Sequence, residues 1–197
     1  ADLATLMTLG ALARLQPDDP THVLASYEVF RPETGRLLTS NTNLARLYNV
    51  WAASLGNGDS AWRALRRAYD LRLQQALPAA RTYAEAEDTS AALRAMAIVL
   101  IGRLGDAKDL STLEPLLSDH RLPRDENAGS TDPMQVRDLA LVTLIERSGE
   151  RPSDYGFRIK PPQQQLYTKF GFETQAARDN AIKAWRAKPD LETPTSQ

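Results

Sequence analysis

Residues 93–119 of this 197-residue chain read LRAMAIVLIGRLGDAKDLSTLEPLLSD, and they predict two consecutive helices joined by a short turn. In the first helix apolar side chains recur at helical spacing, at Leu93, Met96, Ala97, Leu100, Ile101 and Leu104. Ile98 and Val99 make this helix apolar on its remaining sides, so we expect it to be covered on two sides. Gly105 and Asp106 form the turn, and Pro115 bends or delays the shorter second helix.

The sequence pattern of the first of these helices occurs again later in the chain. A shift of 43 residues along the chain brings residues of the same type into alignment at three places. It aligns Leu93-Arg94 with Val136-Arg137, Ala97-Ile98-Val99 with Ala140-Leu141-Val142, and Ile101 with Leu144. Repeats of about 40–47 residues with paired helices are typical of HEAT-type solenoids. Residues 92–119 resemble a HEAT repeat, and residues 136–150 resemble the first helix of the next one.

The resemblance implies an all-α protein, an α-solenoid in which antiparallel helix pairs form a right-handed stack. Each pair of such a stack buries its apolar stripe against its neighbours and leaves an extended surface suited to another protein. After Gly149 the expected second helix is replaced by residues 151–157, RPSDYGF, so the array ends in a capping segment. Residues 153–157 and 171–185 are also similar to the C-terminal part of HEAT-containing proteins from planctomycete-like bacteria.

The rest of the chain is also predicted to be helical. Ala and Leu supply 56 residues, whereas the strand-favouring Val and Ile supply 11, and no stretch alternates cleanly between apolar and polar residues. Further helices are expected over residues 3–11, 21–30, 43–55, 61–77 (or on to 86, with Pro78 kinking or splitting it) and from 174 to 188. Residues 31–35 are expected to form a turn, and Asp132-Pro133 a helix start.

These elements divide the chain into four segments of one continuous solenoid domain. They are N-terminal helical hairpins (1–88), HEAT-like repeats (89–150), a capping segment with the last helix (151–188) and a flexible tail (189–197). The chain starts at Ala1 without an initiator Met or a signal segment, which suggests a processed product or a fragment of a longer polypeptide.

The composition argues against several functional classes. With 24 Lys and Arg against 25 Asp and Glu, the net charge of −1 does not favour a protein that coats nucleic acid or an anionic membrane. The chain has no cysteine, which excludes disulfides, zinc–thiolate sites and cysteine nucleophiles and leaves the cellular compartment open. The longest apolar run, Met96 to Ile101, is too short for a transmembrane segment.

The predicted loop over residues 118–133 is the first candidate for contact with a partner. It is long and carries mixed charges at His120, Arg121, Arg124, Asp125 and Glu126. A solvated insertion between repeats is the alternative. The two histidines of the chain, His22 and His120, have no metal-ligand spacing, so we expect no metal and no cofactor.

A second candidate surface is basic. Arg63, Arg66 and Arg67 lie on the polar side of one predicted helix and could contact phosphates. Asp70 follows Arg66 at i+4 and Arg67 at i+3, and pairing on the helix surface favours an ordinary solvated face instead.

A third candidate is aromatic. Tyr155 and Phe157, with Tyr167, Phe170 and Phe172, lie in or beside the irregular segment that precedes the last helix. They either plug the open end of the solenoid or contact a partner, and the plug is favoured.

The function that fits these patterns best is a non-enzymatic protein-interaction or scaffold module, a subunit or domain of a larger assembly of undetermined oligomeric state. No serine nucleophile elbow, kinase motif set or zinc-protease helix is present in the sequence. Two alternatives stay open: a helical repeat that binds nucleic acid through Arg63, Arg66 and Arg67, and an enzyme without a recognisable motif.

Overall fold

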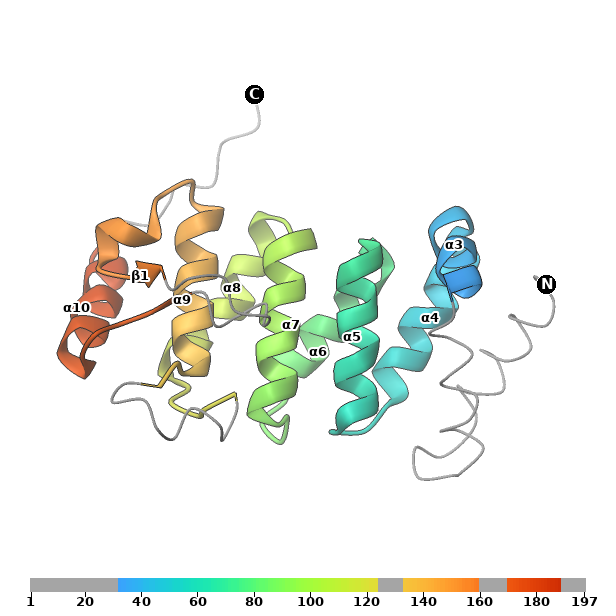
Figure 1. Ribbon diagram of the computed structural model, residues 1–197, viewed down its shortest axis with the longest axis horizontal. Helices are drawn as coiled ribbons and strands as arrows, with labels where there is room; N and C mark the ends of the chain where they lie inside the picture. Colours follow the sequence, from blue (N-terminus) through green and yellow to red (C-terminus); the bar gives the residue numbers. More distant parts are fainter. Residues whose placement is uncertain (1–31, 124–132, 160–169, 189–197) are drawn as a thin grey trace.

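The computed structural model describes residues 32–123, 133–159 and 170–188 (Figure 1). The helices predicted over residues 3–11 and 21–30 and the predicted tail lie outside these residues. The helices are α3 (Pro32–Ser40), α4 (Thr42–Ser54), α5 (Asp59–Leu71), α6 (Leu77–Glu85), α7 (Ala91–Leu104), α8 (Leu110–Leu113), α9 (Val136–Arg147) and α10 (Gln175–Arg186). Short 3₁₀ turns are η1 (Gln74–Ala76), η2 (Ala107–Asp109), η3 (Glu114–Ser118) and η5 (Pro152–Tyr155).

The described residues are all-helical apart from one short antiparallel pair, as the composition predicts. In that pair β1 (Arg158–Ile159) lies against β2 (Phe170–Gly171), with Arg158 opposite Gly171. The helices lie in two rows: α5 contacts α7 and α7 contacts α9, while α4 contacts α6 and α6 contacts α8. From α4 to α9 the chain alternates between the two rows, and α6 and α8 lie behind the front row in Figure 1.

Helix α7 lies at the centre of the core. The Ser90 hydroxyl caps it by accepting a hydrogen bond from the Leu93 N–H, and nearly all of its residues from Leu93 to Ile101 are buried. The expected cover on two sides is confirmed, since α7 contacts α5, α6 and α9. A Cβ at Gly102 would lie 2.8 Å from Thr143 Cγ2 on α9, so the missing side chain allows the two helices to approach closely.

Two predicted boundaries near the N-terminus are wrong. Residues 31–35 were expected to form a turn, but Pro32 begins α3, because a proline in the first helical turn loses no hydrogen bond. The helix predicted over residues 61–77, or on to 86, ends at Leu71, so the break comes before Pro78. Arg72 adopts the left-handed conformation (φ 54°) and its N–H closes the last turn of α5, while Pro78 sits in the first turn of α6.

The predicted start of α9 is also displaced. Pro133 lies before the helix, which begins at Val136 (Asp132 is outside the described residues). A reciprocal capping box sets this boundary, because Gln135 caps the Asp138 backbone while the Asp138 carboxylate accepts the Gln135 N–H at 2.9 Å. The predicted start of the last helix is confirmed, with Thr174 as the cap of α10.

A fully buried ion pair joins α10 to α9. Arg178 Nε lies 2.7 Å from Asp138 Oδ1, and neither side chain is exposed to solvent. The same guanidinium donates to Gln175 Oε1 at 2.8 Å and to the Pro133 carbonyl at 3.1 Å. Burial raises the pKa of Asp138, against the opposing effect of the Arg178 hydrogen bond. The pair therefore connects α10, the first turn of α9 and the segment before it.

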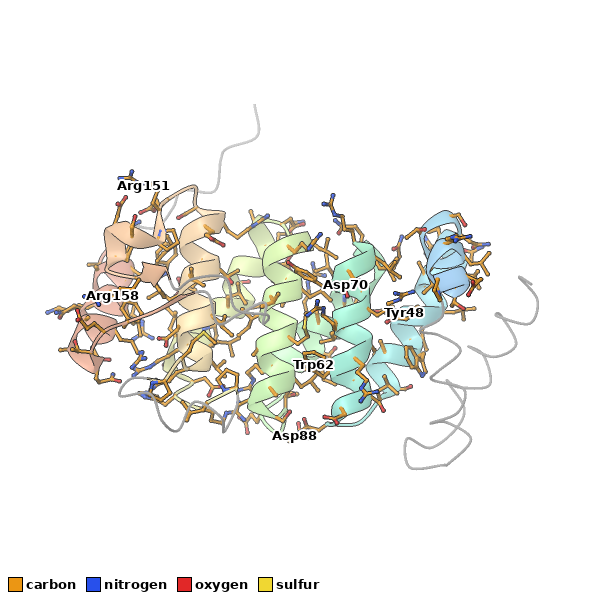
Figure 2. All side chains as sticks on the ribbon, viewed as in Figure 1. Tyr48, Trp62, Asp70, Asp88, Arg151 and Arg158 are labelled. Carbon is orange, nitrogen blue, oxygen red and sulfur yellow. The ribbon has the colours of Figure 1, made fainter. Side chains whose placement is uncertain are left out.

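We predict that Arg178→Ala lowers the free energy of unfolding by about 3–5 kcal/mol, because it leaves the Asp138 carboxylate buried without its cation. Urea denaturation measures the change. Arg158→Ala is the matched control, since the Arg158–Glu173 pair is exposed (Figure 2) and its loss should cost less than about 1 kcal/mol. Equal losses in the two variants would contradict the prediction.

Candidate interaction surfaces

The segment after η3 is held by one aspartate. Asp119 Oδ2 lies 2.6 Å from both Arg94 Nη1 on α7 and Arg121 Nη2, and Arg121 also donates to the Thr89 carbonyl at 2.8 Å. Burial opposes ionisation of Asp119, but the hydrogen bonds from Arg121 and Arg94 outweigh it and lower the pKa to about 2. Arg121, expected on the partner-contact loop, therefore bonds within the chain.

Backbone hydrogen bonds carry this segment to the start of α9. The Val136 N–H donates to the Arg121 carbonyl and the Arg137 N–H to the Asp119 carbonyl, both at 3.0 Å. His120 is exposed between these anchored residues, whereas Arg124, Asp125 and Glu126 lie outside the described residues. Of the two loop candidates that the structure describes, Arg121 bonds within the chain and His120 lines a pocket.

That pocket, which we call the basic pocket, has a volume of about 530 Å³ and lies between η3, α9 and α10. It is lined by Leu117, Ser118, His120, Arg137, Asp179, Ile182, Lys183, Arg186 and Ala187. Two hydrogen bonds join α10 to η3, from Trp185 Nε1 to Glu114 Oε1 at 3.0 Å and from Arg186 Nη2 to Ser118 Oγ at 3.4 Å. These two side-chain hydrogen bonds therefore fix the position of α10 relative to η3, which form two walls of the pocket.

Arg137 forms the buried wall of the basic pocket, with its side chain 5% exposed. Its Nε donates to Gln135 Oε1 at 2.6 Å, and its Nη1 lies 3.3 Å from Asp179 Oδ1. Its Nη2 is buried without a hydrogen-bond partner in residues 32–123, 133–159 and 170–188. Arg137 is not among the site residues predicted from the sequence, although the repeat aligns it with Arg94, which is also buried.

A second hollow, the helix-row groove, crosses the front row of helices. It has a volume of about 500 Å³ and is lined by Tyr69, Arg72, Val99, Gly102, Arg103, Leu104, Leu139, Val142, Thr143 and Glu146. Val99, Leu139 and Val142 are buried or half-buried and make an apolar floor, while Arg72 and Arg103 are exposed. The Arg103 guanidinium lies over the Tyr69 ring, 4.1 Å from its centroid, which orders it at the rim.

Of the three arginines on α5 that were predicted to contact phosphates, two make contacts within the chain. Arg66 Nε donates to both carboxylate oxygens of Asp70 at 3.2 Å, which confirms the expected i,i+4 pairing. Arg67 is directed toward α3, where its Nη2 lies so close that a Cβ at Gly35 would be 2.5 Å away. Arg63 is exposed. The three arginines therefore do not form one open phosphate-binding strip.

The aromatic residues before α10 lie in separate contacts. Phe157 and Phe172 are buried, with ring centroids 4.1 Å apart, so Phe157 belongs to the core. Tyr155 is half-buried: its hydroxyl donates to Glu150 Oε2 at 2.6 Å, and the Lys188 ammonium lies 4.9 Å from its ring centroid. Tyr167 lies outside the described residues. These contacts fit the plug better than an open docking surface.

The described ranges contain neither a candidate metal site nor a candidate membrane span. No group of three or more His, Cys, Asp or Glu side chains there could hold a metal ion. None of the helices described is long and apolar enough to cross a membrane.

The Asp119 contacts predict a specific acid sensitivity. Because the pKa of Asp119 is lowered in the folded state, its stabilising effect is complete above about pH 4 and is lost as the pH falls toward 2. Its share of the free energy of unfolding is about 2 kcal/mol by proton linkage. We therefore expect the free energy of unfolding, measured by urea denaturation at several values between pH 5 and pH 2, to fall less with decreasing pH for Asp119→Asn than for the unchanged protein.

The matched control for this measurement is Asp154→Asn, since the Asp154–Arg151 pair is exposed. Its pH dependence should follow that of the unchanged protein. If Asp119→Asn shows the same acid dependence as that control, Asp119 does not carry the effect.

Comparisons of the chain with protein-family models, with curated proteins and with solved structures gave no match.

Proposed function

We propose that the chain is a HEAT-like solenoid that serves as a non-enzymatic protein-interaction module within a larger assembly. The two-row arrangement supports this proposal, because the chain alternates between the rows from α4 to α9 as successive helix pairs of a solenoid do. In this proposal α5 with α6 and α7 with α8–η3 are successive pairs, and α9 begins the next pair.

The 43-residue repeat gives further support. Arg94 on α7 and Arg137 on α9 align in the repeat; both are buried, and each pairs with an aspartate further along the chain. Of the aligned apolar pairs, four are buried in both helices, namely Leu93 with Val136, Ala97 with Ala140, Ile98 with Leu141 and Ile101 with Leu144, while in the fifth Val99 is half-buried and Val142 buried. The aligned arginines are thus both buried in adjacent front-row helices, although their aspartate partners are not themselves aligned by the repeat.

The observation that carries the proposed function is the helix-row groove. It crosses three successive front-row helices, and its apolar floor lies beside two exposed arginines, Arg72 and Arg103, which outnumber the one exposed carboxylate of the lining, that of Glu146. The partner that fits this combination is a protein segment with apolar side chains for the floor and a carboxylate for the arginines. Since Arg103 is already ordered on Tyr69, little side-chain entropy is lost when the carboxylate binds.

A random-peptide phage library selected on the full chain tests this function. We expect the selected peptides to combine apolar residues with Asp or Glu, and to bind about tenfold more weakly to Arg103→Glu, because the reversed charge repels the peptide carboxylate. A peptide with Lys at the acidic position should recover binding to Arg103→Glu. Fluorescence anisotropy with labelled peptides measures each affinity.

The control is Arg63→Glu, which makes the same charge change at an exposed position that does not line the groove. It should leave peptide affinity unchanged, and circular dichroism should show that both variants stay folded. Equal weakening by the two variants, or no effect of Arg103→Glu, would contradict docking in the helix-row groove.

A further inference from the structure

We propose that the basic pocket binds a phosphate monoester through Arg137, Lys183 and Arg186. This site shares no residue with the helix-row groove, so it does not depend on the function proposed above. Three features of the pocket point to this ligand: the incomplete hydrogen bonding of Arg137, the charge of the lining and the volume.

One edge of the Arg137 guanidinium makes fewer hydrogen bonds than it has donors for. Gln135 accepts from Nε, but the edge formed by Nη1 and Nη2 holds a single oxygen of Asp179, at 3.3 Å from Nη1, and Nη2 has no partner in the described ranges. A buried cationic donor without an acceptor is costly. Two oxygens of one phosphate would satisfy both nitrogens in the bidentate geometry that arginine favours.

Asp179 is the residue that such a ligand would displace. Its side chain is 56% exposed and already accepts a hydrogen bond from Gln175 Nε2 at 2.7 Å, so it can turn toward solvent and keep a partner. In this proposal, moving Asp179 away from Arg137 frees Nη1 and opens the Nη1–Nη2 edge to the pocket that Arg137 lines.

The charge of the lining fits a doubly charged oxyanion. Arg137, Lys183 and Arg186 carry three positive charges against the single carboxylate of Asp179, which leaves two positive charges. A phosphate monoester carries about −1.5 to −2 at neutral pH, whereas a carboxylate carries −1. Lys183 and Arg186 are exposed on α10 and can adjust to the ligand, while the hydroxyl of Ser118 adds a neutral donor.

The same phosphate chemistry has two sources, a small free phosphate and a phosphorylated side chain of a partner protein. The volume of about 530 Å³ accepts either. Isothermal titration calorimetry at pH 7.5 and low salt separates them with three probes: inorganic phosphate, a phosphoserine peptide and the same peptide with serine.

We expect the phosphopeptide or inorganic phosphate to bind, and the serine peptide not to bind. Lys183→Gln/Arg186→Gln, which changes exposed residues only, should weaken phosphate binding about tenfold. Asp179→Asn should strengthen it several-fold, because it removes the competing carboxylate. Arg63→Gln, an exposed arginine on α5, is the control and should leave binding unchanged.

Each outcome decides the proposal. Tighter binding of the phosphopeptide than of inorganic phosphate supports a phosphorylated partner, and equal binding supports a small free phosphate. Absence of binding by both phosphate probes would overturn the site. So would a phosphate affinity that neither the double variant nor Asp179→Asn changes, or one that Arg63→Gln weakens as much as the double variant does.

Discussion

The C-terminal third of this structure depends on the burial of one guanidinium, that of Arg178. A fully buried cation persists only when acceptors surround it, and Arg178 has the Asp138 carboxylate, the Gln175 amide oxygen and the Pro133 carbonyl. These acceptors belong to α10, to α9 and to the residues before α9. Satisfying one side chain therefore fixes where α10 lies against α9, and α10 in turn supplies one wall of the basic pocket.

Arg94, Arg137 and Arg178 share an unusual position, because each lies near the N-terminal end of its helix. Backbone N–H groups make that end partially positive, so a cation there is unfavourable unless a carboxylate compensates it. Asp119, Asp179 and Asp138 provide the compensation, but not equally. Asp138 is fully buried against Arg178, whereas Asp179 is exposed and reaches Arg137 through one long contact. The weakest of the three pairs is the one that faces a pocket.

The two hollows differ in a way that suits different ligands. The helix-row groove has an apolar floor and a short charged rim, and it crosses three helices that lie side by side (Figure 1). The basic pocket gathers cations from α9 and α10, at Arg137, Lys183 and Arg186, against the single carboxylate of Asp179. In our proposals the first accepts a protein segment and the second a phosphate group, so one chain would combine shape recognition with charge recognition.

Local patterns in the sequence were sufficient to predict α7 and α10, because each has a long apolar face and a strong boundary such as Gly105 or Thr174, and they predicted α9 apart from its start. They failed where a boundary depends on contacts made elsewhere. Arg72 ends α5 in a left-handed conformation that no glycine signals, and the capping box of Gln135 and Asp138 begins α9 three residues after Asp132-Pro133.

The candidate site was likewise predictable from the sequence only in part. His120 was identified because its loop is long and charged, but Asp179, Lys183 and Arg186 read as the polar face of an ordinary amphipathic helix. Only the packing of α10 against α9 and η3 brings them to Arg137, since a pattern with helical period records which face is polar and not which distant residue that face meets.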